Sequence, residues 1–408
     1  MSPRINRRSF LQQATLTSAG AIFLPVLPGL SRPSIADPII PDLKKKLGGP
    51  VMIESVELLK YKKEFVTIVT STDGVQGICV GNGKLASMLT FFGRQIKPFF
   101  ERKDATQIEP LLEAVMNFRR NYKYAGMTLW NSVAQVELAT LDMLGKTAQL
   151  PVSQLLGEVV RTEVPIYMSS TLRSTTAEEE VEWVGKRIAE TGAKAAKLKI
   201  GGRMSKNVDA YPGRSEDLIR LSRETWGDAF TIYMDANGSY DVPNAIEMGK
   251  FMQDYNIGFY EEPVFWEDFA GTKAVNEGLA MPVVGGEQDS SLPKWEWMIK
   301  SGAIDTAQPD IMYNGGMIRT LQVAKMAADT GIDCTLHSPK RNAIASCMLH
   351  FAAITPNIDP FQEYRAKLDG YSDLSPDFPV KNGMVQVPTE PGFGVDYDLD
   401  FLKKFKTV

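Results

Sequence analysis

Short apolar segments alternate with amphipathic ones over residues 163–365, and this alternation limits the folds open to the chain more than any other feature. The amphipathic segments predict helices, as at 177–190, 215–225, 243–254 and 316–329. The apolar segments predict eight strands, at residues 165–170, 194–200, 230–236, 257–262, 282–287, 304–310, 332–337 and 358–364. Eight strands with intervening helices over about 200 residues are typical of a parallel (β/α)8 barrel, an α/β fold.

A doubly wound parallel sheet is the competing architecture for the same alternation. Such a sheet usually carries a glycine-rich phosphate-binding loop directly after its first strand. Here the corresponding residues, 168–173, read Met-Ser-Ser-Thr-Leu-Arg and contain no glycine. The sequence therefore favours the barrel.

The first 36 residues differ from the rest of the chain. Arg7 and Arg8 precede an apolar stretch that reaches Leu30 and is interrupted by two prolines and a glycine. This segment resembles a twin-arginine export signal, with cleavage expected near Ala36. No run of 18 apolar residues follows it, so we expect a periplasmic protein with no membrane partner in its mature form.

Residues 51–160 predict a small α+β domain. Three β-rich runs, at 51–61, 64–74 and 75–81, are divided by turn signals such as Thr72-Asp73-Gly74 and followed by helical spacing up to about residue 157. Gly145 is expected to end the helix that begins near Trp130.

Composition excludes several classes of protein and site. The chain has only two histidines, which nearly excludes a zinc site that needs two or three of them, and three cysteines give neither a disulfide framework nor a zinc knuckle. The formal charge of −4 argues against a nucleic-acid partner. Any metal site must rest on carboxylates, which favours a hard cation.

Three carboxylates end three consecutive predicted strands. Asp235, Glu261 and Glu287 are 26 residues apart in each case, which is one strand, one helix and two loops. Residues one such unit apart meet at the same rim of a barrel. Because three converging carboxylates repel one another unless a cation joins them, the sequence predicts a Mg²⁺ site.

Four further residues fall on the same rim. Lys197 and Lys199 lie two apart on the second strand, so both side chains point to one face, and their mutual repulsion makes one of them a usable general base. His337 ends the seventh strand and Asp310 the sixth, which predicts a His–Asp dyad. His350 lies in an apolar segment and is expected to be a packing residue.

These groups together suit the removal of a proton α to a carboxylate. Such a proton is very weakly acidic, so the enolate that forms must be stabilised where its charge develops. A divalent cation on a carboxylate oxygen provides that stabilisation. The lysine and the histidine provide an acid–base group on each side.

The motifs resemble the enolase superfamily and, within it, the mandelate racemase subgroup, over about residues 51–400. They are Lys197-Leu198-Lys199, Met234-Asp235-Ala236-Asn237-Gly238, Tyr260-Glu261-Glu262-Pro263, Gly286-Glu287, Gln308-Pro309-Asp310, Gly315-Gly316, His337-Ser338, Glu363 and Pro391-Gly392-Phe393-Gly394. The resemblance implies a modified (β/α)7β TIM barrel at 161–365, an α+β capping domain at 51–160, and a C-terminal segment, 366–408, that returns to the cap. A homo-oligomer is also expected on this ground.

The resemblance also implies a role for each rim residue. The three acids would bind Mg²⁺, Lys199 would be the base on one face, and Lys197 would neutralise the substrate carboxylate. His337, supported by Asp310, would act on the opposite face. Glu363 would hydrogen-bond a substrate carboxylate oxygen.

Two departures from related branches narrow the activity. The muconate-lactonizing and dipeptide-epimerase branch has a lysine on strand six, where this chain has Asp310. Galactonate-type dehydratases have a histidine two residues after the first metal ligand, where this chain has Asn237. His337 is then the only histidine able to act as an acid.

The same enolate leads to two reactions. We expect a sugar-acid or hydroxy-acid dehydratase, in which His337 protonates a departing β-hydroxyl; a racemase or epimerase of a 2-hydroxy acid is the alternative. From another class, a non-catalytic exported carbohydrate-binding protein on the same scaffold is disfavoured, because the catalytic residues are retained. The expected partner is a small-molecule carboxylate, and Asn237, Lys62 and Lys84 are candidate substrate-binding residues.

Overall fold

The computed structural model describes residues 38–365 and 374–408, and the chain from Ile39 to Val408 forms one compact unit. The predicted export segment, residues 1–36, lies outside the described residues. The predicted domain boundaries at 160/161 and 365/366 stay predictions. Within the described ranges, no helix is long and apolar enough to cross a membrane.

In the described residues the larger sheet has ten strands, of which eight are parallel. The parallel strands are β4 (Glu163–Ser169), β5 (Ala195–Lys199), β6 (Thr231–Asp235), β7 (Phe259–Glu261), β8 (Val283–Gly285), β9 (Thr306–Ala307), β10 (Asp333–Cys334) and β11 (Gln362–Arg365). Neighbours pair in chain order from β4 to β10, and β11 pairs with β4. Between the segments of β10 and β11, the Cys334 N–H donates to the Asn357 carbonyl at 2.8 Å, and at the rim the Arg365 N–H donates to the Lys340 carbonyl at 3.1 Å.

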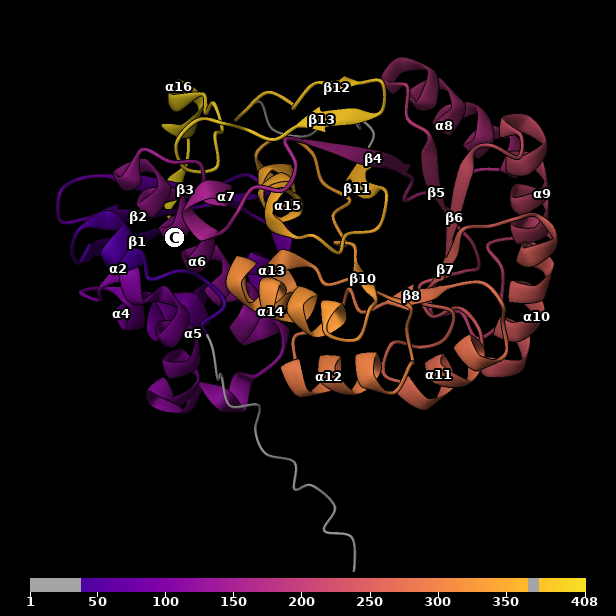
Figure 1. Ribbon diagram of the computed structural model, residues 1–408, viewed down its shortest axis with the longest axis horizontal. Coiled ribbons are helices and arrows are strands. Elements are labelled where there is room, and N and C mark those ends of the chain that lie inside the picture. Colours follow the sequence, from indigo (N-terminus) through magenta and orange to yellow (C-terminus); the bar gives the residue numbers. More distant parts are fainter. Residues whose placement is uncertain (1–37, 366–373) are drawn as a thin grey trace, which may run out of the picture. The chain divides into compact units, whose positions relative to one another are not determined.

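Helices connect these strands and cover them from outside (Figure 1). They are α8 (Ala177–Thr191), α9 (Arg214–Trp226), α10 (Val242–Asp254), α11 (Phe269–Glu277), α12 (Leu292–Lys300), α13 (Ile311–Asn314), α14 (Met317–Ala328) and α15 (Asn342–Ile354). In the described residues the next elements after β11 are the strands β12 (Val380–Lys381) and β13 (Met384–Gln386), which form a hairpin that joins β4, and not an eighth barrel helix. The predicted (β/α)7β architecture is confirmed.

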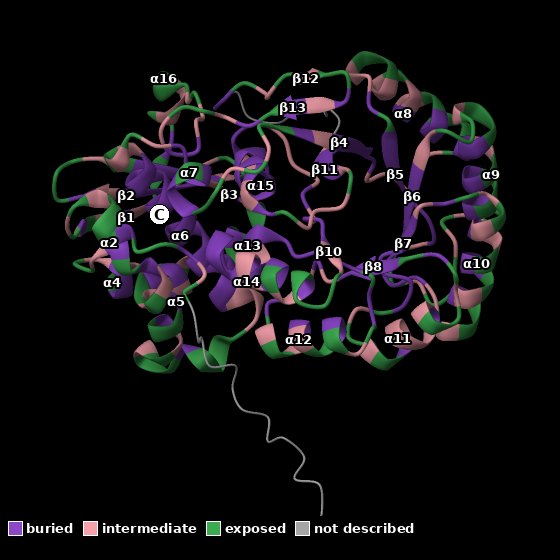
Figure 2. Ribbon diagram, in the orientation of Figure 1, coloured by how far each residue is buried: buried purple, intermediate pink, exposed green. Residues whose placement is uncertain are grey.

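Local sequence explains where these helices begin and which face they bury. Thr176 and Glu179 form a reciprocal capping box at the start of α8, and Asp241 accepts from the Asn244 N–H at the start of α10. Figure 2 shows the strands β5 to β8 buried, whereas the helices outside them expose their outer faces. This matches the amphipathic spacing of the sequence.

The smaller sheet is antiparallel, and helices pack against it. Its strands are β1 (Ile53–Tyr61), β2 (Glu64–Ser71), β3 (Gln76–Gly81) and β14 (Lys406–Thr407), and β14 pairs with β1. The helices around it are α2 (Leu43–Leu47), α3 (Leu89–Phe91), α4 (Lys97–Phe100), α5 (Ile108–Asn117), α6 (Met127–Ala148), α7 (Val152–Leu156) and α16 (Leu399–Leu402). The predicted α+β cap is confirmed as an architecture.

The long helix α6 joins the cap to the barrel. The buried Glu137 carboxylate accepts from the backbone N–H groups of Met317 and Ile318 at the start of α14. The prediction that Gly145 ends this helix is wrong, since α6 continues to Ala148. Gly145 is needed for packing instead: a Cβ there would lie 2.8 Å from the Gly392 Cα.

An apolar layer fills the barrel on the side away from the C-terminal ends of its strands. Tyr167, Ala195, Tyr233, Phe259 and Val284 form one buried cluster, in which the Tyr233 and Phe259 rings stack 3.8 Å apart. Side chains two positions further along a strand point to the same side. The next inward positions therefore bring polar groups to the C-terminal mouth of the barrel.

Candidate active site

The three predicted metal ligands meet at the C-terminal mouth of the barrel. Asp235 ends β6 and pairs in register with Glu261, which ends β7. Glu287 follows β8, and all three side chains are buried. One carboxylate oxygen from each residue lies within 4.8 Å of the others.

Glu287 reaches this cluster through an unusual backbone conformation. Strand β8 ends at Gly285, and Gly286 has φ +112°, a region that favours glycine. A Cβ on Gly286 would collide with the Trp295 ring. The turn at Gly286 thus redirects the chain so that Glu287 joins the acids of the two preceding strands.

The three carboxylates suit a hard divalent cation. Burial raises the pKa of Glu261 to about 8, and the nearby charge of Asp235 contributes to the rise. Oε1 of Glu261 is buried and accepts no hydrogen bond from the described residues. A cation with oxygen ligands would relieve the repulsion and use that oxygen.

Lys197 lies under the acid cluster and is fully buried. Its Nζ is 2.5 Å from Oε2 of Glu261 and 3.0 Å from Oε1 of Glu363. Burial disfavours the ammonium, but these two carboxylates hold the pKa of Lys197 well above its usual value. Lys197 is therefore a fixed positive charge in the mouth.

Both oxygens of Glu363 are also engaged by the protein. Oε1 accepts from the Ser169 hydroxyl at 2.6 Å, and Oε2 accepts from the Ser338 N–H at 2.7 Å. Although burial opposes ionisation, the charge of Lys197 lowers the pKa of Glu363 to about 2.

Lys199 flanks the first acid. Its ammonium forms an ion pair with Asp235, and it lies 3.3 Å from Oδ1 of Asn237. Burial opposes ionisation of Asp235, but the charges of Lys199 and Lys197 lower the pKa of this carboxyl. The predicted base thus contacts the first predicted metal ligand.

His337 flanks the third acid. Its Nδ1 is 2.9 Å from Oδ2 of Asp310, and its Nε2 is 3.0 Å from Oε2 of Glu287. Burial opposes protonation, but the charge of Glu287 and the hydrogen bond to Asp310 raise the pKa of His337 above its usual value. The predicted dyad is therefore present in the geometry.

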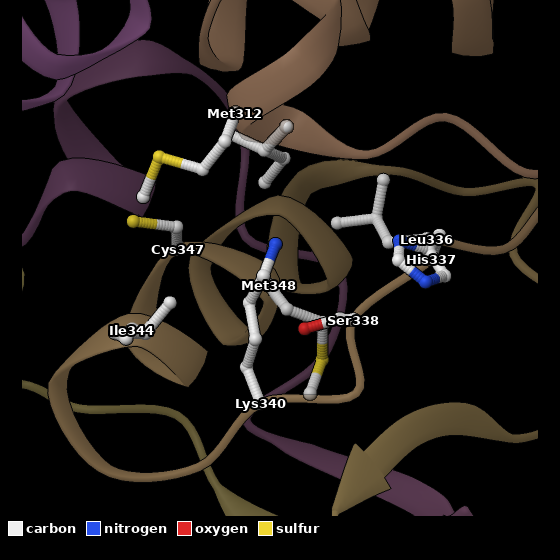
Figure 3. Close-up of a pocket in the computed structure, with 9 residues that line it drawn as sticks. Met312, Leu336, His337, Ser338, Lys340, Ile344, Cys347 and Met348 are labelled. Atoms are coloured by element: carbon white, nitrogen blue, oxygen red, sulfur yellow. The ribbon is translucent and has the colours of Figure 1, made fainter. Parts of the chain in front are cut away.

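Asp310 is held from several sides. Its Oδ1 accepts from the N–H groups of Met312 and Tyr313 at the start of α13, and its Oδ2 lies 2.8 Å from Nζ of Lys340. Burial opposes ionisation, yet Lys340 and His337 lower the pKa of Asp310. Figure 3 shows His337 at the edge of a pocket around Lys340, beside the apolar side chains of Met312, Leu336, Ile344, Cys347 and Met348.

The candidate substrate-binding residues differ in position. Asn237 is buried, and its Nδ2 donates to Asp235 at 3.2 Å. Lys84 donates to the Tyr313 hydroxyl at 2.7 Å, and the Tyr313 ring is 6.4 Å from the His337 ring between centroids. Lys62 is exposed in the β1–β2 turn over the Tyr61 ring, and within the described ranges no hydrogen bond or ion pair connects it to the mouth.

Sequence reasoning missed two residues of the mouth. Arg173 lies in the loop after β4 and donates to Oδ1 of Asn237 at 2.8 Å. Glu262 is buried beside Asn237, and burial and the charge of Glu287 raise the pKa of its carboxyl well above its usual value. The sequence signal for Arg173 was its position just after a strand, which surface residues share, and Glu262 stood in the Tyr260-Glu261-Glu262-Pro263 motif without an assigned role.

Comparison with known proteins agrees with this site. Residues 179–401, more than half of the chain, match the family model described as enolase C-terminal domain-like. The chain belongs to this family and thus to the enolase superfamily of enzymes, as the motifs predicted.

Three proteins illustrate the similarity. The chain is 28% identical to D-galactarolactone cycloisomerase of Agrobacterium fabrum, over 74% of this chain and 81% of that protein. It is 26% identical to arabinonate dehydratase of Saccharolobus solfataricus, over 83% and 89%. A mandelate racemase/muconate lactonizing protein of Paracoccus denitrificans, solved with magnesium, shares the fold with a TM-score of 0.82, 24% identity, and coverage of 88% and 99%.

Proposed function

We propose that this protein removes the proton α to the carboxylate of a sugar acid or related hydroxy acid, and that the product is the dehydrated 2-keto acid. One observation carries the proposal. Lys199 contacts the first acid of the carboxylate cluster and His337 contacts the third, so an acid–base group stands at each end of it. General acid–base catalysis needs such groups within hydrogen-bond reach of the reacting atoms.

Asp235, Glu261 and Glu287 would hold Mg²⁺, which supplies electrostatic stabilisation of the negative charge that develops on the substrate carboxylate. The support for this ion is the set of three buried carboxylates and the unpartnered Oε1 of Glu261.

The chain's own residues perform the remaining steps. Lys199 acts as the neutral amine and accepts the α-proton on its Nζ, which becomes the ammonium. Lys197, fixed between Glu261 and Glu363, binds the substrate carboxylate as a permanent cation. His337 donates a proton from Nε2 to the departing β-hydroxyl, and Asp310 holds the ring at Nδ1 in the orientation that this transfer requires.

Dehydration is preferred over racemisation because of two of the relatives that this chain resembles in sequence. One is named as a cycloisomerase of a sugar-acid lactone, and the other as a dehydratase of a sugar acid. Racemisation remains the second proposal, since Lys199 and His337 contact opposite members of the acid cluster and could serve the two faces of one carbon.

A library of sugar acids and hydroxy acids, incubated with the protein and Mg²⁺ in D₂O, separates the two reactions. A 2-keto product means dehydration. Deuterium at the α-carbon with the β-hydroxyl retained means racemisation or epimerisation. If no acid in a broad library loses its α-proton, the proposed function is wrong.

We also propose that the protein is exported through the twin-arginine route and acts in the periplasm as a homo-oligomer. Arg7, Arg8 and the apolar stretch after them support export.

A further inference from the structure

Arg173 is a half-buried cation with neutral partners. It leaves the loop after β4 and donates to the backbone carbonyls of Gly201 (3.2 Å) and Asp235 (3.4 Å), and to Oδ1 of Asn237 (2.8 Å). Within the described residues, Arg173 forms no ion pair, and no hydrogen bond reaches its Nη1. Charges removed from water are normally paired, so this guanidinium lacks an anionic partner.

The guanidinium lies next to the predicted catalytic groups. Oδ1 of Asn237, which accepts from Arg173, also lies 3.3 Å from Nζ of Lys199. The guanidinium therefore stands on the Lys199 side of the mouth.

A second arginine adds to this positive region. Arg203 is exposed in the loop after β5, where its N–H donates to the Ser239 hydroxyl and the next residue donates to the Asn237 carbonyl. The loops of Arg173 and Arg203 therefore meet at Asn237, one through its Oδ1 and the other through its backbone carbonyl. Two arginines on loops that meet at one residue give this side of the mouth a positive charge, which favours an anion.

We propose that Arg173 and Arg203 form a subsite for a second carboxylate of the substrate, so that the preferred substrate is a dicarboxylic hydroxy acid. This inference rests on the proposed function, in which the first carboxylate binds at the acid cluster. An arginine offers two parallel N–H donors, which match a carboxylate in geometry and charge. The subsite belongs to barrel loops and is separate from Lys84, which approaches from the cap.

Galactarate and galactonate test the proposal because they differ only at C6, where galactarate carries the second carboxylate. We would measure kcat/KM for α-proton loss with Mg²⁺ for the wild type, Arg173→Met and Arg203→Met. The wild type is expected to prefer galactarate, and each substitution to reduce the galactarate-to-galactonate ratio by about tenfold or more. Arg220→Met, on the exposed face of α9, is the matched control and should keep the wild-type ratio.

Several outcomes would overturn the subsite. A wild type without preference for the diacid would do so, as would substitutions that slow both acids equally, since a purely structural arginine has that effect. Stronger preference for galactonate 6-phosphate would refute the carboxylate assignment. Arg173→Met removes a half-buried side chain, and a folding defect would obscure its effect. Because Arg203 is exposed, Arg203→Met is expected to fold and tests the same subsite.

Calorimetry separates this inference from the proposed function. The dissociation constants of both acids for the Mg²⁺-loaded protein give the same ratio without turnover. If neither acid loses its proton, the proposed function fails for this pair, while the binding ratio and its dependence on Arg173 and Arg203 still decide the subsite.

Discussion

Nε2 of His337 lies 3.0 Å from Oε2 of Glu287, so the proposed acid rests directly on a proposed metal ligand. The other ring nitrogen is held by Asp310 at 2.9 Å. The imidazole is therefore oriented along a line from Asp310 to the centre of the acid cluster. A substrate bound beside Glu287 would have Nε2 within reach.

Replacement of one acid should weaken Mg²⁺ binding. Glu261→Gln removes one of three charges at the cluster and should raise the Mg²⁺ dissociation constant by about tenfold or more. Isothermal titration calorimetry measures this constant directly. Glu182→Gln, on the exposed surface of α8, is the control and should bind as the wild type does. Unchanged affinity in Glu261→Gln would refute the ligand assignment.

Loss of either acid–base group should stop turnover without unfolding the chain. Lys199→Ala and His337→Asn should each lower the rate on the true substrate by about 10²–10⁴-fold, the usual contribution of a positioned acid or base. Circular dichroism and Mg²⁺ titration should show that fold and metal binding are retained. Near-wild-type rates in either variant would show that the role assigned to that residue is wrong.

The carboxylate behind His337 should matter for orientation. Asp310→Asn keeps an oxygen for the N–H groups of Met312 and Tyr313 but removes the charge that faces His337 and Lys340. Partners of this kind typically change activity by about 10–100-fold. We expect a loss of that size in kcat with an unchanged melting temperature in the presence of Mg²⁺. An unaltered kcat would argue that the dyad has no part in the reaction.

His350 should make stability depend on pH. Burial lowers its pKa from 6.5 to about 4, and its Nδ1 accepts from the Ser153 N–H at 3.1 Å. Between pH 4 and pH 6.5, His350 binds a proton in the unfolded chain but not in the folded chain. The free energy of unfolding therefore falls as pH drops from 6.5 to 4. The group accounts for about 3 kcal/mol of this loss.

Denaturant unfolding across this pH range tests the effect. His350→Gln keeps an acceptor for the Ser153 N–H and removes the titration, so its stability should fall less steeply over the same window. The difference between the two proteins isolates His350 from other titrating groups. Parallel curves for the wild type and the variant would contradict the assignment.

The proposed export has its own test. Cells that produce the full chain should contain a shortened form, cleaved near Ala36, in the periplasmic fraction. Replacement of Arg7 and Arg8 by lysine should leave the full-length chain in the cytoplasm. Mass spectrometry of the two fractions gives the cleavage site. Wild-type protein confined to the cytoplasm with residues 1–36 intact would count against export.

The sequence predicted the barrel and the strand-end residues of its rim. Both predictions depend on features that repeat at regular intervals along the chain. Asp235, Glu261 and Glu287 recur once per strand–helix unit, and Lys197 and Lys199 share a strand face. The prediction that Gly145 ends its helix failed because this glycine is explained by a tertiary contact and not by a regular repeat. Its role is close packing against Gly392, and nothing within the helix itself records that contact.

At the site, Arg173 is a second residue whose role depends on a contact that the sequence does not record. Its hydrogen bond to Asn237 joins residues 64 positions apart, and the loop that carries it has no periodicity to interpret. Glu287 is an intermediate case. The interval between strands predicted its place on the rim, but its approach depends on the left-handed turn at Gly286 beside Trp295.

The sequence by itself determined that the residues ending successive strands, from Asp235 to His337, share the mouth of the barrel, because every β/α unit returns the chain to the same edge of the sheet. Only the tertiary structure decided how those residues pair: Lys197 with Glu261 and Glu363, Lys199 with Asp235, and His337 between Asp310 and Glu287. These pairings depend on the curvature of the sheet and the paths of its loops, which bring together atoms that no regular spacing in the chain connects.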